Sequence, residues 1–421
     1  MCMGAMGLAA LMMGGCSSSK KMANGDNMEK STATVINRGS DTDSGYLILS
    51  DEQRSALRSG NEFAVNLFKT QTNMSSNVMS PLSVSYLMGM LANGANGNTQ
   101  KEILKTLGVG DLSLQTLNET YRAVLNTAAT RDESTTINIA NCVAVDKRYS
   151  IKPSFTDVVK TMYDANVESL DFTSHKSVDV INGWCDKQTN GMIPKIVDNL
   201  SAADVAVLMN AIYFEGTWTN KFEKDQTKEE NFQGYTRDIK RVKMMRQEDK
   251  FRYVNKEDFE AVELPYGNRS YSMMVLLPKS GVSISEMMQP LDAEKLELIG
   301  RDMEKCVVDL KLPKFTINTS LSLNEPISKL GAPIMFKSGS ANFSNMSDAS
   351  VYISKMFQKA KIEVSEEGTK ATAVTVGMVA LTSLNPNELH KVKFYANRPF
   401  VYVITERQSG AIFFIGQYLG D

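Results

Sequence analysis

Histidine is scarce in this chain of 421 residues, which contains only His175 and His390. Neither lies in a recognisable catalytic motif, and the polar stretch around His175 favours a solvated surface position over general-base chemistry. The GxSxG, GxGxxG, GxxxxGK[ST] and HExxH patterns are also missing. Hydrolase and nucleotide-binding functions therefore lack their usual parts, and an independent hydrolase would have to depend on one of the two histidines.

Cysteine is sparse as well. Cys2 and Cys16 lie in the N-terminal stretch, which leaves Cys142, Cys185 and Cys306 at wide spacing. Because three is an odd number, at least one of them is unpaired within the chain, and we expect all three to be buried as small apolar residues. No CxxC or His-rich spacing predicts a metal site, and nothing suggests another cofactor.

Charge of neither sign is in excess. The chain contains 46 Lys and Arg and 48 Asp and Glu, which gives a formal net charge of -2. Nucleic acid is therefore not an expected partner. The 42% of hydrophobic residues are typical of a soluble globular protein with a large core. No internal repeat or second polar linker occurs, so we predict one domain over residues 49–421.

The N-terminus contains a short apolar run at residues 5–13, which is too short to span a bilayer. It ends at Met13-Gly14-Gly15-Cys16, which resembles the lipobox of a bacterial lipoprotein signal, although Met replaces the usual Leu and no basic residues precede the run. The resemblance implies a signal peptide over residues 1–15 and lipidation of Cys16. An uncleaved N-terminus is the alternative.

Residues 16–48 are rich in Ser, Asn, Asp, Gly and Lys, which predicts a flexible tether behind the lipidated cysteine. The protein would then lie in the bacterial cell envelope, on its periplasmic side or at the cell surface. It would contact the membrane only through its lipid anchor.

Residues 366–375 carry an unusual pattern near the C-terminus. Before them, Ala360, Ile362 and Val364 alternate with polar residues, which predicts a half-buried strand that ends at Gly368. The period of two then continues with small residues on one side, namely Thr369, Ala371, Ala373 and Thr375. This pattern suits a segment that is exposed in one state and a buried central strand in another. A Thr/Ala-rich surface loop is the plain alternative.

Other motifs predict local structure along the chain. Ser80 can cap a helix that has Pro81 in its first turn, and residues 99–102 predict a capping box at the start of the next helix. Residues 211–214 predict a buried strand, with Trp218 as a large anchor beyond its end. The apolar runs at residues 401–404 and 411–416 predict a hairpin.

Together these motifs resemble the serpins, a family of suicide protease inhibitors. The resemblance covers nearly everything from about residue 50 to the end. It implies an α+β serpin fold: a single domain with a large, mainly antiparallel central sheet, smaller sheets, eight or nine helices, and a reactive loop at about residues 366–390. The blocks that match, besides residues 366–375, are Ser80-Pro81-Leu82-Ser83, Gly94-Ala95-Asn96-Gly97, Leu107-Gly108, Ile181-Asn182-Gly183-Trp184, Thr189-Asn190-Gly191-Met192-Ile193, residues 209–218, Glu263-Leu264-Pro265-Tyr266, Leu312-Pro313-Lys314-Phe315 and Asn397-Arg398-Pro399-Phe400.

The resemblance implies that the chemistry belongs to the protease that the protein meets, so the chain itself is not an enzyme. The protease serine attacks the loop, and the cut loop inserts into the main sheet before the acyl-enzyme is hydrolysed. The implied product is a covalent complex between a monomeric inhibitor and its target.

Family spacing places the scissile residue fourteen positions after the hinge glycine, which from Gly368 gives the bond Thr382-Ser383. Leu381, Ala380 and Met378 are alternative cut sites. No Lys or Arg occurs at residues 371–390. Elastase-like, chymotrypsin-like or subtilisin-like enzymes are therefore the expected targets, with papain-like cysteine proteases a further option.

The hinge distinguishes an inhibitor from a relative that keeps only the fold. The small hinge positions carry no proline, charge or bulk, which favours an inhibitor, although Lys370 and Val374 depart from the commoner Glu and Ala on the outward side. The alternative is a non-inhibitory serpin that acts as a binding or scaffold protein. The hinge residues are Glu366, Glu367, Gly368, Thr369, Ala371, Ala373 and Thr375.

The resemblance implies two further sites, for which ordinary core or surface structure is the alternative. Lys314 and Glu366 match a pair at the top of the sheet opening, near Trp218. A polar cluster beneath the opening has a glutamine where the family usually has histidine, which removes the basis for pH sensitivity there. Its members are Ser80, Ser83, Asn210 and Gln358.

Overall fold

The computed structural model describes residues 47–72, 74–128, 130–369 and 389–421, which belong to one compact unit. In these ranges the chain forms two sheets and nine α-helices, so the predicted α+β architecture is confirmed. The helices are α1 (Asp51–Lys69), α2 (Pro81–Gly94), α3 (Gly97–Thr106), α4 (Leu114–Ala128), α5 (Pro153–Tyr163), α6 (His175–Gln188), α7 (Ile284–Met288), α8 (Ala293–Asp302) and α9 (Asn324–Leu330).

The helix starts follow local capping in one case and depart from it in another. Ser80 caps α2 with Pro81 in its first turn, as predicted, and the Ser83 amide donates to the Ser80 hydroxyl at 3.3 Å. The predicted capping box at residues 99–102 is wrong, because α3 begins at Gly97 and Asn96 caps it. The side chain of Thr99 accepts a hydrogen bond from the Asn342 amide instead.

The larger sheet has nine strands in the order β1-β15-β14-β8-β7-β6-β9-β13, with β5 paired to β6. The predicted C-terminal hairpin is confirmed as β14 and β15, which lie well inside this sheet. Its strands are β1 (Asn77–Met79), β5 (Lys228–Gln233), β6 (Ile239–Asn255), β7 (Phe259–Pro265), β8 (Tyr271–Pro278), β9 (Glu304–Pro313), β13 (Lys391–Tyr395), β14 (Phe400–Glu406) and β15 (Ile412–Tyr418).

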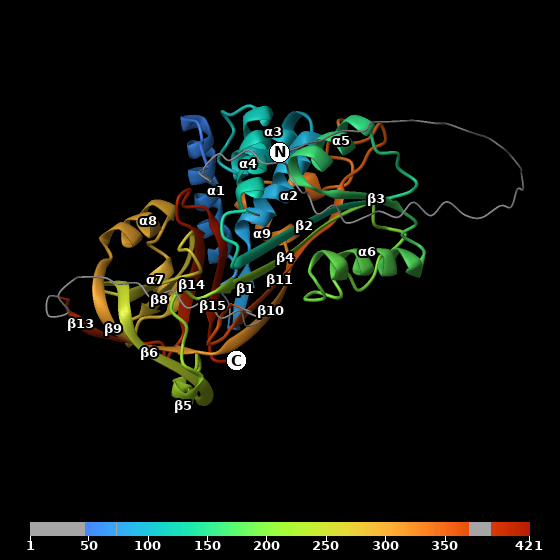
Figure 1. The fold of residues 1–421 in the computed structure, drawn as a ribbon. Helices are drawn as coiled ribbons and strands as arrows, with labels where there is room; N and C mark the ends of the chain where they lie inside the picture. Colours follow the sequence, from blue (N-terminus) through green and yellow to red (C-terminus); the bar gives the residue numbers. More distant parts are fainter. Residues whose placement is uncertain (1–46, 73, 129, 370–388) are drawn as a thin grey trace, which may run out of the picture. The chain divides into compact units, whose positions relative to one another are not determined.

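The six-stranded sheet has the order β10-β11-β12-β4-β2-β3, and β11 also pairs directly with β4. Its strands are β2 (Thr135–Asp146), β3 (Asn166–Leu170), β4 (Ala206–Thr217), β10 (Phe315–Ser322), β11 (Ile353–Val364) and β12 (Gly368–Thr369). Figure 1 shows α6 on one face of β2, β4 and β11, and helices α2 to α5 on the other.

Strand β4 is apolar along most of its length because both of its faces are covered. Leu208, Ile212 and Phe214 enter the main core, whereas Met209 and Ala211 enter a smaller core beneath α6. A strand covered on both faces has no solvated side, which explains why its sequence shows no alternation.

The three cysteines of the described chain are free and buried, as predicted. Cys142 of β2 and Cys185 of α6 belong to the smaller core. Burial raises the pKa of the Cys185 thiol to about 12. The described residues contain no group of acidic, histidine and cysteine side chains that could hold a metal ion, and none of their helices is long and apolar enough to cross a membrane.

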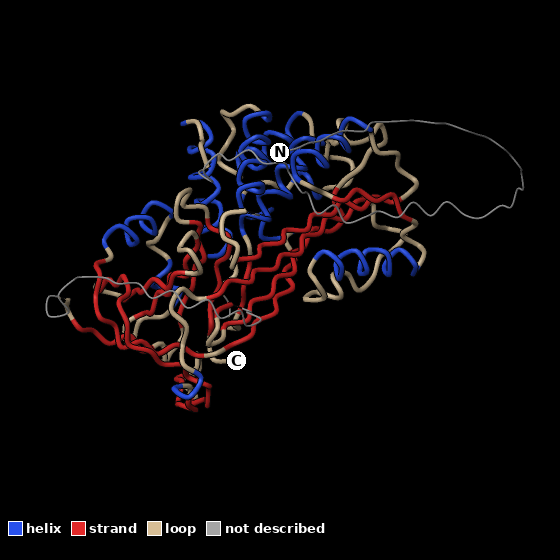
Figure 2. Tube along the Cα trace, in the orientation of Figure 1, coloured by secondary structure: helices blue, strands red, loops and turns tan. Residues whose placement is uncertain are grey.

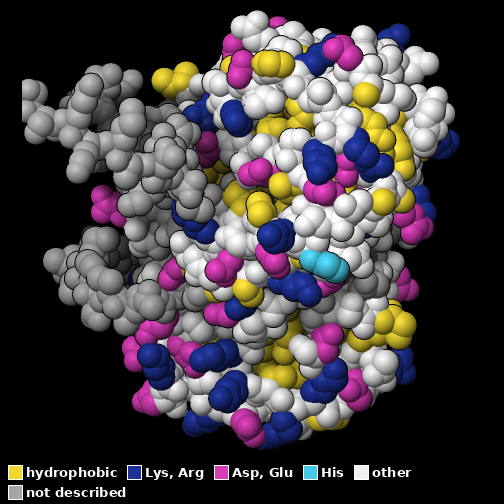
Figure 3. All heavy atoms as spheres, turned by 90° about the vertical axis from the view of Figure 1, so that its right-hand side faces the viewer, with side chains coloured by type: hydrophobic (Ala, Val, Ile, Leu, Met, Phe, Trp, Pro, Cys, Tyr) yellow, Lys and Arg dark blue, Asp and Glu magenta, His cyan; other side chains and the backbone are white. Residues whose placement is uncertain are grey.

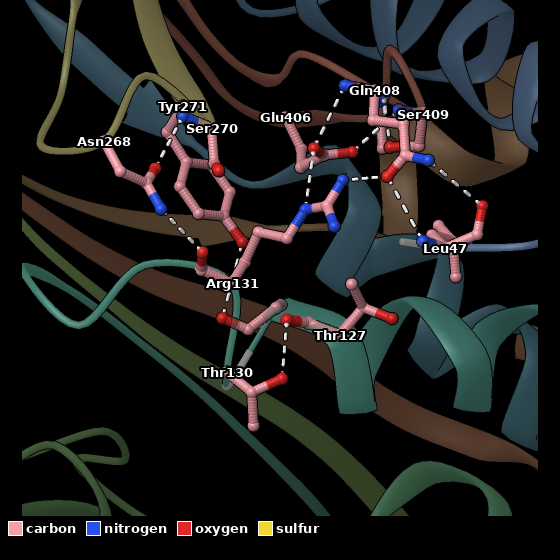
Figure 4. A network of polar contacts seen from close by, with 12 residues as sticks. Leu47, Thr127, Thr130, Arg131, Asn268, Ser270, Tyr271, Glu406, Gln408 and Ser409 are labelled. Atoms are coloured by element: carbon pink, nitrogen blue, oxygen red, sulfur yellow. Dashed lines mark hydrogen bonds and ion pairs between the residues drawn. The ribbon is translucent and has the colours of Figure 1, made fainter. Parts of the chain in front are cut away.

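A polar network ties the first described residue to the turn between β14 and β15 (Figure 4). The Leu47 amide donates to the side chain of Gln408 at 3.1 Å, and the Arg131 guanidinium donates to the same oxygen. Arg131 also pairs with the buried Glu406 at 3.4 Å. The chain is therefore anchored to the domain at Leu47, close to where the sequence predicts that the tether ends.

Candidate functional site

Two long parallel strands meet inside the six-stranded sheet, and we call their boundary the seam. β4 and β11 pair directly, with Ile353 opposite Ala206 at one end and Lys361 opposite Tyr213 at the other. Beyond that end β12 lies between them, with Thr369 opposite both Gly216 and Val364. The long strands of this sheet are among the red tubes of Figure 2.

The direction of β12 matters for the stability of the seam. β12 is antiparallel to both β4 and β11, whereas these two are parallel to each other. Parallel pairing is slightly less stable per residue than antiparallel pairing. A strand that continued along the path of β12 would replace one parallel ladder with two antiparallel ones.

The turn before β12 differs from the prediction. β11 ends at Val364, so the prediction that this strand ends at Gly368 is wrong. The amide of Ser365 donates to the Gly368 carbonyl at 2.8 Å and the Gly368 amide donates back at 3.2 Å, which closes a tight turn. Gly368 has a φ of +149°, and a Cβ there would overlap the carbonyl oxygen of Gly216.

The turn is held by a group of contacts that we call the hinge clamp. The Trp218 indole donates to the Ser365 carbonyl at 2.9 Å, and the Trp218 amide donates to the Glu367 carbonyl at 3.0 Å. Trp218 stacks on Tyr266 with ring centroids 4.3 Å apart. The Tyr266 hydroxyl lies 2.7 Å from that of Thr369, which is fully buried. The hinge clamp thus fixes both the turn and the first residue in the seam.

Ion pairs add to the hinge clamp. Glu366 is 6% exposed, and its carboxylate accepts from Lys314 at 2.8 Å and from Thr227 at 3.0 Å. Burial opposes ionisation of Glu366, but these hydrogen bonds outweigh it and hold the pKa below its usual range. Hydrogen bonds from Lys221 and Lys224 likewise lower the pKa of Glu367, at distances of 2.8 and 3.0 Å.

A buried amide crosses the seam farther down. Gln358 of β11 lies directly opposite Asn210 of β4, and its side-chain amide donates to the Asn210 side chain at 2.9 Å. The same Gln358 side chain accepts from the Ser80 amide at 2.8 Å and donates to the Ser80 carbonyl at 2.9 Å. Ser80 and Ser83 hydroxyls bond at 3.0 Å. The four predicted cluster residues therefore lie together.

The sequence did not indicate how far this network extends. Asn210 donates to Asn141 of β2 at 3.0 Å, and Asn141 donates to the Tyr163 carbonyl at the end of α5 at 3.2 Å. A lone asparagine in the apolar second half of β2 was the only signal for Asn141. Tyr266 was likewise missed as a partner of Trp218 and Thr369.

The predicted top-of-sheet group, Trp218, Lys314 and Glu366, lies together in the hinge clamp. Glu367, Gly368 and Thr369 complete the described part of the hinge. Other predicted site residues lie outside the described residues, and their roles stay predictions. These are Cys16, Ala371, Ala373, Thr375, Met378, Ala380, Leu381, Thr382 and Ser383.

The two histidines do not form a site. His175 begins α6 and His390 precedes β13, and both side chains are exposed. α6 and β13 lie at opposite sides of the molecule in Figure 1. His175 and His390 are therefore too far apart to act together in catalysis.

Comparisons with known proteins give one consistent family. Residues 58–420 match the model of a family described as Serpin (serine protease inhibitor). The human leukocyte elastase inhibitor is 34% identical over 376 residues, which cover 85% of this chain and 97% of the relative. Iripin-2 of Ixodes ricinus is 31% identical over 381 residues, with coverages of 88% and 95%.

Solved structures agree with the sequence relatives. The native state of Tengpin, a thermophilic serpin, has a TM-score of 0.80 and 28% identity over 88% of this chain and 95% of its own. Thyroxine-binding globulin in complex with thyroxine has a TM-score of 0.77 and 26% identity over 87% of this chain and 99% of its own.

Substitution of Gln358 by Leu should weaken the seam. The change leaves the Ser80 amide, the Ser80 carbonyl and the Asn210 side-chain oxygen without their buried partner, at a cost of about 2–4 kcal/mol. The melting temperature should fall by about 3–5 °C in thermal denaturation, because 1 kcal/mol shifts it by only about 1.3 °C in a domain of this size. Gln115→Leu is the control, because Gln115 is exposed and its side chain bonds to Glu119 alone among the described residues. Equal losses in both variants would contradict a role for the cross-seam amide.

Acid should open the hinge clamp. Glu366 and Glu367 have lowered pKa values in the fold, so they stabilise it above the unfolded value of about 4.3. That stability is lost as the pH falls through their folded pKa values. In a Trp184→Phe background, Trp218 emission should shift to the red below about pH 4.3.

The double variant Glu366→Gln, Glu367→Gln should show part of this shift already at neutral pH. Glu325→Gln is the control, since Lys329 lowers the Glu325 pKa at an exposed site away from the hinge clamp. An unchanged acid transition in the double variant would refute the assignment to these two carboxylates.

Proposed function

This chain belongs to the serpin family, and we propose that it is an irreversible inhibitor of serine proteases. In this proposal a target protease cleaves the reactive loop, and the loop inserts between β4 and β11 while it is still bound to the protease as an acyl-enzyme. The observation that carries the proposal is the position of β12, which already enters the seam in the antiparallel direction. The relatives named as inhibitors of leukocyte elastase support the same reading.

The register of β12 predicts where an inserted loop would lie. Thr369 stands opposite Gly216 and Val364, and each step of two residues along the loop moves two residues back along both neighbours. Ala371 would then fall between Phe214 and Ile362, and Ala373 between Ile212 and Ala360. Their neighbours are buried in the main core, so only small side chains fit without displacing them.

The same register would bring Thr375 between Asn210 and Gln358. These two amides bond directly in the present structure, so the inserting strand must separate them. A threonine hydroxyl can both donate and accept, which lets it take over part of the lost bonding. The small hinge residues and the cross-seam amide thus fit one mechanism.

The proposed chemistry is that of the protease. Its serine attacks the carbonyl carbon of the scissile residue, the new amino terminus leaves, and an ester links the loop to the enzyme. Insertion before water attacks that ester would leave the covalent complex. We propose Thr382-Ser383 as the bond, with Leu381, Ala380 or Met378 as alternatives, and elastase-like, chymotrypsin-like or subtilisin-like enzymes as targets, with papain-like cysteine proteases a further option.

We also propose a lipid anchor at Cys16 that holds a monomeric inhibitor in a bacterial cell envelope. The support is the sequence at residues 1–48, which lies outside the described residues except for residues 47 and 48. Cys16→Ser expressed in a bacterium should move the protein from the detergent-extracted membrane fraction to the soluble fraction. Release of the parent protein without detergent would contradict the anchor.

Incubation with elastase-like, chymotrypsin-like and subtilisin-like proteases tests the inhibitor proposal. A complex that survives boiling in detergent should appear on a gel, and mass spectrometry of the released fragment identifies the cut bond. Protein cleaved in its loop by a non-target protease should melt at least about 10 °C higher than intact protein. In a domain of this size each kcal/mol raises the melting temperature by about 1.3 °C, so this rise corresponds to about 8 kcal/mol of added strand pairing.

Thr369→Arg is the matched variant, since an unpaired charge buried beside Tyr266 costs about 3–5 kcal/mol. Most of its loops should be cut without complex formation, so the number of inhibitor molecules consumed per protease should rise at least about tenfold. Thr316→Arg, on the exposed side of β10, should behave as the parent. Cleavage of the parent with no complex and no change in melting temperature would favour the non-inhibitory binding or scaffold protein.

A further inference from the structure

Positive charge is concentrated on the outward face of three adjacent strands, β6, β9 and β13. On β9, Cys306, Val308 and Leu310 point into the core, so the alternate residues point outward. The pairing registers place outward cations of β6 and β13 on either side of them. We call these residues the cationic face: Arg246, Lys250, Arg252, Lys305, Lys311, Lys391 and Lys393.

Four acidic residues balance part of this charge, in the pairs Arg246–Asp309, Lys391–Glu248, Lys311–Glu230 and Arg252–Glu263. Seven cations less four carboxylates leave three positive charges. Lys250, Lys305 and Lys393 have no ion-pair partner within the part of the chain that the structure describes. Lys305 and Lys393 are exposed, and Lys250 is half-buried.

Repulsion between like charges on the cationic face lowers the stability of the fold. Lys305 stands directly opposite Arg252, and Lys311 directly opposite Arg246. Like charges at directly opposite positions destabilise a strand pair. The three lysines without an ion pair gain no opposite charge within the described chain in return, so their charge is available to another molecule.

The cationic face lies beside the return of the reactive loop. β13 begins at Lys391, and eight residues separate Lys391 from the proposed bond at Ser383. Eight extended residues span at most about 28 Å. A protease domain of about 200 residues is about 40 Å across. A protease bound to the loop is therefore held within reach of the cationic face.

We propose that the cationic face docks an acidic patch on the surface of the target protease and speeds the encounter with the loop. This inference rests on the proposed function. Asp309 and Glu248 lie among the cations. Their carboxylates would repel a polyanion, whereas a protein surface carries charges of both signs and can complement such a mixed face. The face seen in Figure 3, by contrast, interleaves cationic and acidic side chains without such an excess.

The test compares two triple variants with the same loss of charge. Lys250→Gln, Lys305→Gln, Lys393→Gln neutralises the cationic face, and Lys101→Gln, Lys160→Gln, Lys176→Gln neutralises exposed lysines on α3, α5 and α6. The second-order rate constant of complex formation is measured against two subtilisin-like proteases, one of net negative and one of net positive charge at pH 7. Ionic strength is varied from about 0.01 to 1 M, where the Debye length falls from about 30 to 3 Å.

With the negatively charged protease, the first triple variant should react about tenfold more slowly than the parent at low salt, and the difference should vanish at high salt. The control triple variant should react at the parent rate. The number of inhibitor molecules consumed per protease should be the same for the parent and both triple variants. Equal losses in both triples, or a loss independent of salt, would overturn the proposal. Heparin provides a second check. The proposal would be overturned if heparin accelerated complex formation, if only the first triple variant lost that acceleration, and if this variant still reacted at the parent rate without heparin. The partner of the cationic face would then be a polyanion.

A failure of the proposed function is distinguishable from a failure of this inference. If no variant forms a covalent complex, the rate of loop cleavage at limiting protease takes the place of the rate of complex formation. A salt-dependent loss confined to the first triple would still support docking of the protease on the cationic face. Equal cleavage rates in all variants would overturn it.

Discussion

The parallel pairing of β4 with β11 is the constraint on which the rest of the structure depends. On its outer side β11 is held by the antiparallel strand β10, and β4 is held by the long antiparallel strand β2. The interior of the six-stranded sheet therefore contains one parallel ladder between two antiparallel ones. Since parallel pairing is slightly weaker per residue, this ladder is the one at which the interior of the sheet divides most readily.

Two sets of contacts span the seam, and they differ in character. The hinge clamp is partly ionic and lies where β12 enters, so its strength depends on the charge of Glu366 and Glu367. The amide of Gln358 is neutral and fully buried, and it joins β11 to Asn210 of β4 and to the start of α2. A strand that entered the seam would meet the hinge clamp first and the amide network later.

The geometry at the entrance explains why particular residues stand there. A Cβ on Gly368 would overlap the backbone of Gly216, and a Cβ on Gly216 would press against the rings of Tyr266 and Phe214. Thr369 is small enough to lie buried beside Tyr266. The chain re-enters the sheet at β13, which is part of the cationic face. In the proposed mechanism one end of the loop would therefore carry the contacts for insertion, and the other end those for the target protease.

Local sequence determined several elements of this protein because neighbouring residues decide them. The alternation of Ala360, Ile362 and Val364 fixed which side of β11 is buried, Ser80 and Pro81 fixed the start of α2, and Trp218 was recognisable as an anchor beyond β4. The fold and the main groups of site residues followed from the ordered motifs and their resemblance to a family.

Only the tertiary structure decided the partners that lie far apart in the chain. The local motif predicts that Thr99 caps its own helix, whereas its side chain bonds to Asn342. β11 ends four residues before Gly368 because that glycine bonds back to Ser365. Asn141, Tyr266 and the cationic face were not identified, since strand register sets their neighbours. Register depends on which strands pair and in which direction, and those choices are made by packing across the whole core, which no local stretch of sequence contains.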